Sequence, residues 1–564
     1  MANKTRLMAL ALSGLIGSVQ AGEKEELLKL RNTTTNLIKQ LVKQGILTDK
    51  AANEMIKQAE VEAGQQAAAA KAAGQKEALP ADEVRVAYVP DFVKDEIRQQ
   101  VRSELREEVV GDVMQKAKNE QWGLPNALPE WTRKFKLSGD IRLRSQHDYQ
   151  APDNIPNSYL DYQAINDARG VTNAGLDAFY NTTEDRQRFR ERVRIGIDAN
   201  VTDSLKAGIR LATGNQRDPV STNQNLANYG NRYDFTVDRA YLQYDAIDDN
   251  KFKWLTLSGG RIKNPWYTGG GEFTGGSELV WDTDLSFEGF AATLRHHLGE
   301  TDRLMDNGDQ SHQAYLTVGA FPLQESSFSS DKWLLGGQAG MDWLFANQDN
   351  LKLGAAYFDY VNLQAKQNTT ASGTCDTNNR ANTASRPEFM QGGNTLATIC
   401  KEGTRLAPGT LPAMVGLASD FNIVNLNASY DMALFAPYHL RFSGDYARNI
   451  GFDKQEVSRL YGSAVDAKTT AWQFRADFGW PKAEVAGHWN VFAAYKYLGR
   501  DAVLDAFTDS DFHLGGTNFK GWFIGGNYGL MKNVWLTGRW LTADMISGPT
   551  WGVDVLQMDI NTQF

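Results

Sequence analysis

The sequence of 564 residues has only two cysteines and, beyond residue 21, no long run of apolar residues. A membrane-spanning helix needs about 20 such residues, so transmembrane helices are excluded after that point. An excess of basic charge is also lacking, because 68 Asp and Glu outnumber 59 Lys and Arg, which gives a net charge of −9 and a pI of about 5.5. No terminal basic arm is present, and we expect no nucleic-acid partner.

Signatures of catalysis and of cofactor binding are missing as well. The motifs G-x-S-x-G, H-E-x-x-H, C-x-x-C-H and the Walker glycine loop do not occur. The seven histidines are scattered, and the adjacent His296 and His297 would point to opposite faces of a strand. We therefore expect no enzymatic activity, no metal site and no cofactor.

The first 21 residues are predicted to be a secretory signal peptide. Lys4 and Arg6 give a positive start, Leu7–Gly17 an apolar core, and Val19–Ala21 a cleavage site with small residues. The alternative is a retained membrane anchor, for which the apolar core is short. The rest of the chain is therefore expected to be exported.

Residues 22–132 are predicted to be mainly helical. In 22–64, leucines follow the 3-4 spacing of a short coiled coil, or of one amphipathic helix packed on a neighbour. Residues 65–90 are predicted to be a linker, and 91–132 a second charged helix with the connection to the following domain. Such a segment favours an oligomeric bundle without fixing its order.

From residue 133 the pattern changes to strands, most clearly in Gln187–Val201. One set of alternate positions is mainly apolar, whereas the other begins with four arginines: Arg188, Arg190, Arg192 and Arg194. A period of two is that of a β-strand. Stacked arginines repel one another in a soluble sheet, but they suit a membrane barrel with one face on lipid and the other on water. A mean hydropathy of −0.46 is compatible with such alternation.

Residues 133–564 are predicted to form an all-β transmembrane barrel of about 16 antiparallel strands. Short and long connections alternate, as expected for periplasmic turns and outer loops. The long connections are 150–186, 214–233, 266–285, 364–421, 450–470 and 500–518. The 298–312 connection is longer than this rule expects and marks the least certain strand assignment.

The last strand ends the chain on an aromatic residue. Leu556, Met558 and Ile560 alternate with polar residues up to Phe564. This pattern resembles the C-terminal signal that the barrel-assembly machinery reads in bacterial outer-membrane proteins. The alternative is a soluble edge strand that ends in phenylalanine.

The barrel segment resembles a bacterial outer-membrane porin. More narrowly, the chain is similar to the putative-porin family with a helical periplasmic N-terminal segment, on the evidence of Leu41–Thr48, Val84–Pro90 and Leu279–Asp284. The resemblance implies a passive, often trimeric channel in the Gram-negative outer membrane, surrounded by its lipid. It implies no particular substrate.

Side-chain parity predicts which residues line the pore. The first three strands are neighbours in a sequentially connected barrel, so their arginines are expected to form one cationic wall. The expected pore-lining residues are Arg142, Arg144, Arg188, Arg190, Arg192, Arg194, Arg210, Arg441, Arg475 and Arg539. Glu191 has lipid-facing parity, which is unusual for a charged residue. Three explanations stay open: a position above the bilayer, a contact between protomers, or a neighbouring bulge.

The third outer loop, 266–285, carries four acids: Glu272, Glu278, Asp282 and Asp284. General porins fold this loop into the barrel as a constriction. Acids placed there would face the arginine wall and create a transverse field that favours polar solutes. In the alternative, the loop caps the barrel and its acids are solvated.

Cys375 and Cys400 both lie in the longest outer loop. In an exported chain two cysteines are expected to form one disulfide, and the alternative is two free thiols.

The sequence thus predicts a porin for ions and small polar solutes with a mild preference for anions. Two other roles stay open: a structural tether between outer membrane and cell wall, and a barrel sheath for an electron-transfer partner.

Overall fold

A computed structural model describes residues 134–249, 251–269, 276–298, 312–369, 373–375, 377–403, 408–433 and 435–564. All lie within one compact unit, Met114–Phe564. The predicted signal peptide, helical segment, linker and second helix (1–132) fall outside the described residues, and so does Glu272. No helix among the described residues has the length and apolar character needed to cross a membrane.

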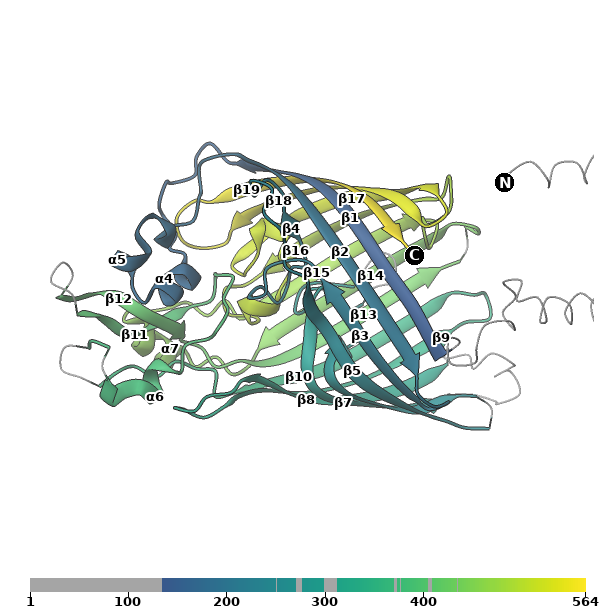
Figure 1. The fold of residues 1–564 in the computed structure, drawn as a ribbon, viewed down its shortest axis with the longest axis horizontal. Coiled ribbons are helices and arrows are strands. Elements are labelled where there is room, and N and C mark those ends of the chain that lie inside the picture. The colour runs from purple at the N-terminus through teal and green to yellow at the C-terminus, as the bar shows by residue number, and fades with distance from the viewer. Residues whose placement is uncertain are drawn as a thin grey trace, which may run out of the picture. The chain divides into compact units, whose positions relative to one another are not determined.

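Sixteen antiparallel strands of the described chain form a closed barrel wall (Figure 1), as predicted. Neighbouring wall strands follow chain order, and β19 closes on β1. The wall strands are β1 (Phe135–Gln150), β2 (Arg186–Asn200), β3 (Leu205–Ala212), β5 (Thr236–Ile247), β6 (Lys253–Lys263), β7 (Ser286–His297), β8 (Gln313–Gln324), β9 (Lys332–Leu344), β10 (Asn350–Val361), β13 (Asn422–Met432), β14 (His439–Asn449), β15 (Thr470–Gly479), β16 (Trp489–Leu498), β17 (Phe519–Met531), β18 (Val534–Met545) and β19 (Gly552–Gln563).

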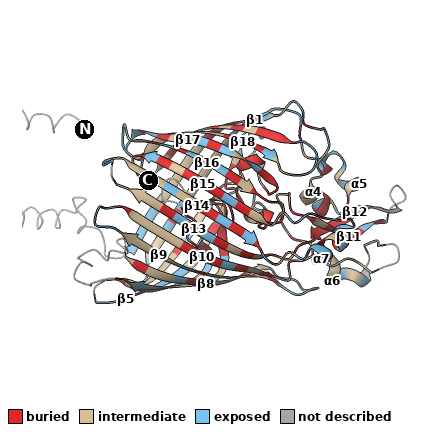
Figure 2. Ribbon diagram, turned by 180° about the vertical axis from the view of Figure 1, so that it is seen from behind, coloured by how far each residue is buried: buried red, intermediate tan, exposed pale blue. Residues whose placement is uncertain are grey.

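The wall has an apolar outer face and a mainly polar inner face on the arginine side. On β1, Leu137 and Leu143 are exposed, whereas Arg144, Gln146 and Asp148 at the other parity are buried. Figure 2 shows buried and exposed residues alternating along the strands. This is the period-two pattern of a barrel whose outer face meets lipid.

Connections at one end of the barrel are mostly long, and they carry the described helices and a second, two-stranded sheet (Figure 1). We call this the loop end and the other the turn end. The loop-end elements are α4 (Tyr162–Ala168), α5 (Val171–Ala174), η2 (Gly175–Ala178), η4 (Thr377–Asn379), α6 (Arg380–Thr383), β11 (Leu396–Gly403), β12 (Pro408–Leu417), α7 (Lys454–Tyr461), η5 (Asp505–Phe507) and η6 (Phe512–Leu514). The 298–312 connection joins β7 to β8 at the turn end, and the two strands pair directly.

The loop-end helices have local capping signals. Asp453 precedes α7, and its side chain accepts hydrogen bonds from the backbone N–H groups of Gln455 (2.8 Å) and Glu456 (3.1 Å). Gly462 ends the helix with φ of 89°, a conformation that favours glycine. Asp161 caps α4 in the same way through Ala164.

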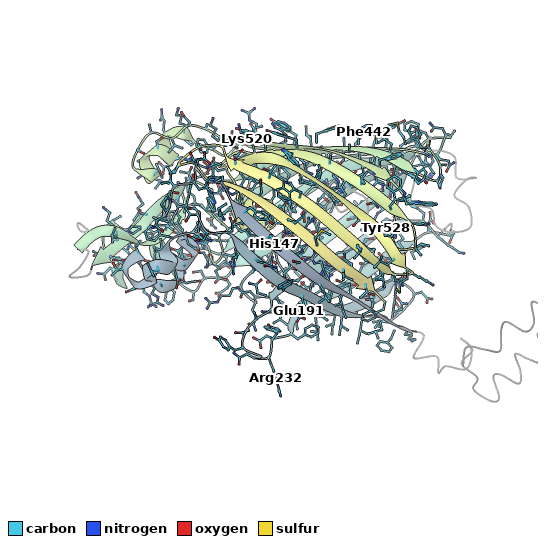
Figure 3. The ribbon with its side chains drawn as sticks, turned by 90° about the horizontal axis from the view of Figure 1, so that it is seen from above. His147, Glu191, Arg232, Phe442, Lys520 and Tyr528 are labelled. Carbon is cyan, nitrogen blue, oxygen red and sulfur yellow. A yellow bond between two sulfur atoms is a disulfide. The ribbon has the colours of Figure 1, made fainter. Side chains whose placement is uncertain are left out.

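The β3–β5 connection leaves the wall, enters the barrel and returns. Gly214 (φ 118°) marks the departure, and a Cβ atom there would lie 3.0 Å from the Ser221 and Thr222 backbone. The chain returns as β4 (Gln224–Asn225), which pairs with β2 beyond the end of β3. Glu191 is one of the β2 residues that pair with β4, and by side-chain parity it belongs to the outer face of the wall (Figure 3).

A hydrophobic core fills one side of the barrel interior. Trp281 of the β6–β7 connection is 2% exposed and contacts Phe287, Phe358 and Phe507 edge-on or tilted, with ring centroids 5.0–6.1 Å apart. Trp266 packs on Phe358 at 5.2 Å. Because these aromatic rings occupy the β7–β10 side, open space is left toward the arginines of β1 and β2.

Candidate functional site: the barrel interior

All ten arginines that the sequence places on the inner parity lie on the inner side of the wall. Strand registry brings those of the first two strands together, because Arg142 lies opposite Arg192 and Arg144 opposite Arg190. Arg210 follows on β3, while Arg441, Arg475 and Arg539 lie on later strands.

Acids on the wall itself neutralise many of these arginines. Asp140 accepts hydrogen bonds from Arg192 (3.1 Å) and Arg194 (2.8 Å). The other wall pairs are Arg188–Asp148 (2.6 Å), Arg144–Asp559 (2.8 Å), Arg475–Asp477 (2.7 Å), Arg441–Asp431 (2.5 Å) and Arg210–Asp238. These acidic partners were not predicted from the sequence, although most of them share the inner parity. The wall is thus much less cationic than the arginines alone suggest.

The described parts of the β6–β7 loop cross the barrel interior. The backbone N–H of Tyr267 donates to Gln338 on β9 (2.7 Å), and its hydroxyl lies 2.6 Å from Ser429 on β13. At the other end of the loop, Asp284 reaches the arginine wall, with its Oδ1 at 3.1 Å from Arg194 and 3.5 Å from Arg192. Asp284 therefore touches the arginines directly instead of facing them across a gap.

Asp284 is also fixed by its own surroundings. Its Oδ2 accepts a hydrogen bond from the Thr222 hydroxyl (3.0 Å). Burial tends to raise the pKa of Asp284, but Arg192 and Arg194 outweigh it and hold the pKa below its usual range. This carboxylate is charged at neutral pH.

The other two described acids of this loop do not pair with arginines. Asp282 accepts hydrogen bonds from the backbone N–H groups of Ser510 (2.9 Å) and Asp284 (2.7 Å). Burial, followed by the charge of Glu278, raises the pKa of Asp282 well above its usual range. Burial and the neighbouring Asp509 raise the pKa of Glu278 to about 7.

The β16–β17 loop supplies an acid that was not predicted from the sequence. Asp511 lies 3.0 Å from Arg144 and also pairs with Arg539. Burial opposes its ionisation, but Arg144 and Arg539 hold the pKa of Asp511 well below its usual range. No local pattern in the 500–518 segment indicated this role, because the contact depends on how the loop folds into the barrel.

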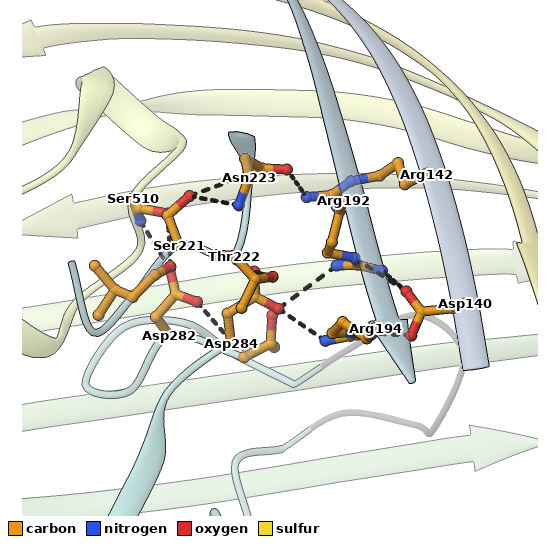
Figure 4. Close-up of polar contacts among 12 residues, drawn as sticks. Asp140, Arg142, Arg192, Arg194, Ser221, Thr222, Asn223, Asp282, Asp284 and Ser510 are labelled. Atoms are coloured by element: carbon orange, nitrogen blue, oxygen red, sulfur yellow. Dashed lines mark hydrogen bonds and ion pairs between the residues drawn. The ribbon is translucent and has the colours of Figure 1, made fainter. Parts of the chain in front are cut away.

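Three loops meet at Ser510. Its hydroxyl donates to the carbonyl of Val220 in the β3–β5 loop (3.1 Å), and its backbone N–H donates to Asp282 in the β6–β7 loop. Beside it, Asn223 contacts Ser221 (3.1 Å) and accepts from Arg142 on the wall (2.5 Å). Figure 4 shows this network from Ser510 to Asp140. We call this level the Ser510 layer.

Two cavities lie on either side of the Ser510 layer. The outer cavity, of about 630 Å³, is lined by residues of the loop end together with Arg188 and Arg190. The inner cavity, of about 350 Å³, is lined by Arg142, Arg192 and residues nearer the turn end. Ser510 lines both.

A family model described as Putative porin matches residues 31–564. The chain belongs to the Putative porin family. No curated protein matches it.

Three solved structures that resemble this chain come from different bacteria. A high-pH structure of OprB from Pseudomonas putida is 11% identical, with a TM-score of 0.42, covering 79% of this chain and 97% of that one. The outer membrane channel DcaP of Acinetobacter baumannii is 11% identical, with a TM-score of 0.37, covering 76% and 97%. OmpT of Vibrio cholerae, in its trimer form, is 10% identical, with a TM-score of 0.37, covering 76% and 99%.

Family and fold together make this porin an outer-membrane channel. Groups of three or more histidine, cysteine, aspartate or glutamate side chains arranged to hold a metal do not occur in the described parts of the barrel and its loops.

Two of the ten predicted pore-lining arginines have no carboxylate partner among the described residues. Arg142 donates to Asn223, and Arg190 donates to the Gln146 side chain at 3.3 Å. In both side chains Nε is buried and has no hydrogen-bond partner in the described structure. Arg142 lines the inner cavity and Arg190 the outer one.

The remaining predicted site residues lie at the two ends of the porin. Cys375 and Cys400 are joined by a disulfide in the β10–β13 loop. Phe564 exchanges two backbone hydrogen bonds with Gly139 of β1, of 2.9 and 3.0 Å. A Cβ atom on Gly139 would lie 2.5 Å from the Phe564 ring, so this glycine lets the terminal ring approach the first strand.

Proposed function

We propose that this porin is a passive channel for ions and small polar solutes with a mild preference for anions. The observation that carries the proposal is the pair Arg142 and Arg190, which line the two cavities without a carboxylate partner among the described residues. A guanidinium stays ionised at any physiological pH. Its field lowers the energy of a passing anion and raises that of a cation.

In this proposal the ion-paired arginines have a different role. Arg192 and Arg194 hold the β6–β7 loop through Asp284, and Arg144 and Arg539 hold the β16–β17 loop through Asp511. These pairs fix the loops that enclose the Ser510 layer, which is the proposed constriction. Ion selectivity then depends on the net charge that remains around the Ser510 layer after ion pairing, and not on the number of arginines.

Reversal potentials in planar bilayers under a salt gradient test the proposal. The wild-type porin is expected to pass anions in preference to cations, and Arg142→Gln with Arg190→Gln should shift the ratio toward cations. Arg459→Gln on α7 is the matched control, because this exposed arginine carries the same charge outside the barrel. A cation-selective wild type, or an unchanged ratio in the double variant, would refute the proposal.

The assembly that we propose is a homotrimer in outer-membrane lipid, inserted by the barrel-assembly machinery. In support, Arg232 projects beside the barrel (Figure 3), and Tyr229 of the same 226–235 segment is fully exposed, so that both are accessible to a second copy. Native mass measurement of the detergent-solubilised porin tests the trimer, and a monomer would refute it. The tether and sheath roles and the periplasmic position of residues 22–132 remain predictions from the sequence.

A further inference from the structure

The outer cavity has a cationic wall provided by one strand. Arg188 and Arg190 lie two residues apart on β2, so their side chains leave the same face about 7 Å from each other. Four arginines and two aspartates line the cavity: Arg186, Arg188, Arg190, Arg500, Asp148 and Asp218. The cavity therefore carries a cationic excess.

Arg190 is freer to accept a ligand than its neighbour Arg188. Asp148 already occupies Arg188 at 2.6 Å, whereas Arg190 makes a single side-chain hydrogen bond in the described structure, to Gln146. A guanidinium has five N–H donors in a fork that matches a carboxylate. Most of the donor capacity of Arg190 is thus unused by described protein groups.

Residues of the loop end add aromatic rings to the lining of the same cavity. Tyr159 and Tyr180 contact Trp551, with ring centroids 5.1 and 5.7 Å apart. The tyrosine hydroxyls are already used, because Tyr159 donates to the carbonyl of Pro549 (2.6 Å) and Tyr180 to that of Gln391 (3.0 Å). What these side chains offer to a ligand is therefore ring surface, which packs well on another planar ring.

We propose that the outer cavity is a binding site for small aromatic carboxylates. The carboxylate pairs with Arg190, and the ring lies against Tyr180 and its aromatic neighbours. An inorganic anion would leave the aromatic rings unused, and a neutral aromatic compound would leave Arg190 unpaired. This inference rests on the proposed anion preference and names a class of solute for it.

Calorimetric titration of the purified full-length porin in detergent tests the site, with benzoate, benzamide and acetate as probes. Saturable benzoate binding is expected, at least about tenfold tighter than that of either other compound, because each lacks one of the two contacts. Arg190→Gln should weaken benzoate binding by about tenfold or more. Tyr180→Leu should weaken benzoate but not acetate, whereas Tyr180→Phe, which keeps the ring, should bind benzoate as the wild type does.

Arg459→Gln serves as the charge-matched control and should bind benzoate normally. The inference is refuted if wild-type porin shows no saturable benzoate binding, if benzamide binds equally well, or if Arg190→Gln changes nothing. Bilayer recordings separate the two proposals. Anion preference without benzoate binding overturns the site alone, whereas benzoate binding in a cation-selective channel supports the site and overturns the proposed function.

Discussion

Replacement of Asp511 by asparagine removes one negative charge from the proposed constriction while nearly preserving side-chain shape. In the native porin this carboxylate pairs with Arg144 and Arg539 and accepts a hydrogen bond from Gln557 (3.0 Å). The amide oxygen of asparagine can still accept from Arg144 and Gln557 at the Oδ1 position, whereas the amide nitrogen that replaces Oδ2 cannot accept from Arg539. The main change is therefore that the positive charges of two arginines are no longer offset by this acid.

The size of the effect follows from Coulomb's law. An ion passing about 6 Å from the altered charge changes in energy by roughly 0.7 kcal/mol in water, or roughly 0.4 kcal/mol with screening at 0.1 M salt. The energy of the anion falls by this amount and the energy of the cation rises by it. The energy difference between the two ions therefore changes by about 0.8 to 1.4 kcal/mol in favour of the anion. The anion-to-cation permeability ratio should then rise by about fourfold to tenfold.

The assay is the reversal potential of single channels under a KCl gradient. Asp466→Asn is the matched control, because this acid is 90% exposed at the loop end and should leave the ratio unchanged. Conductance in symmetrical salt reports whether the loop has moved. An Asp511→Asn channel with native conductance and an unchanged or more cation-selective ratio would show that charge at this level does not set selectivity.

Three further predictions concern other parts of the porin. Burial raises the pKa of Glu278 to about 7, so anion preference should increase as the pH falls from 8 to 6, and Glu278→Gln should abolish this step in a reversal-potential titration. Because the folded pKa exceeds the ordinary value of 4.5, the group also favours folding at low pH, and this contribution is lost as the pH rises through 7. Changing Cys375 and Cys400 to serine removes a cross-link that spans 25 residues and stabilises the fold by about 3 kcal/mol through chain entropy. The 362–421 loop should then be cleaved faster in limited proteolysis, and an unchanged cleavage rate would contradict this. Phe564→Ala should reduce the amount of heat-modifiable, assembled barrel in membranes, because the ring beside Gly139 is lost; a wild-type amount would exclude the assembly role.

The wall of the barrel could be predicted from the sequence because its signal is local. Alternation along Gln187–Val201 gives the strand, its two faces and the inner position of four arginines, and β2 is observed as Arg186–Asn200. Chain-order pairing then brings Arg142 and Arg144 beside them. Each step needs only the period of a strand and the topology of a barrel.

The electrostatics of the interior could not be predicted in the same way. Asp140 and Asp559 share the inner parity, so attention to acids as well as arginines would have indicated some of the pairs. Asp511 had no such signal, because it reaches Arg144 over 367 residues of sequence through a folded loop. The short strand β4 and the β11–β12 hairpin were also not predicted. Both lie within long loops, where strand pairing is set by tertiary contacts and not by a local sequence pattern.

The ion pair between Arg144 and Asp559 lies where the first wall strand meets the last, across 415 residues of sequence. Before β19 pairs with β1, Arg144 lies on an open sheet edge and lacks Asp559 as a partner. The side chain is 1% exposed in the closed barrel, so an unclosed intermediate must keep that guanidinium hydrated or paired elsewhere. Closure of the barrel consequently depends on the final strand, and a chain truncated before β19 would keep an open edge on β1 where Arg144 has lost Asp559 and could pair only with Asp511.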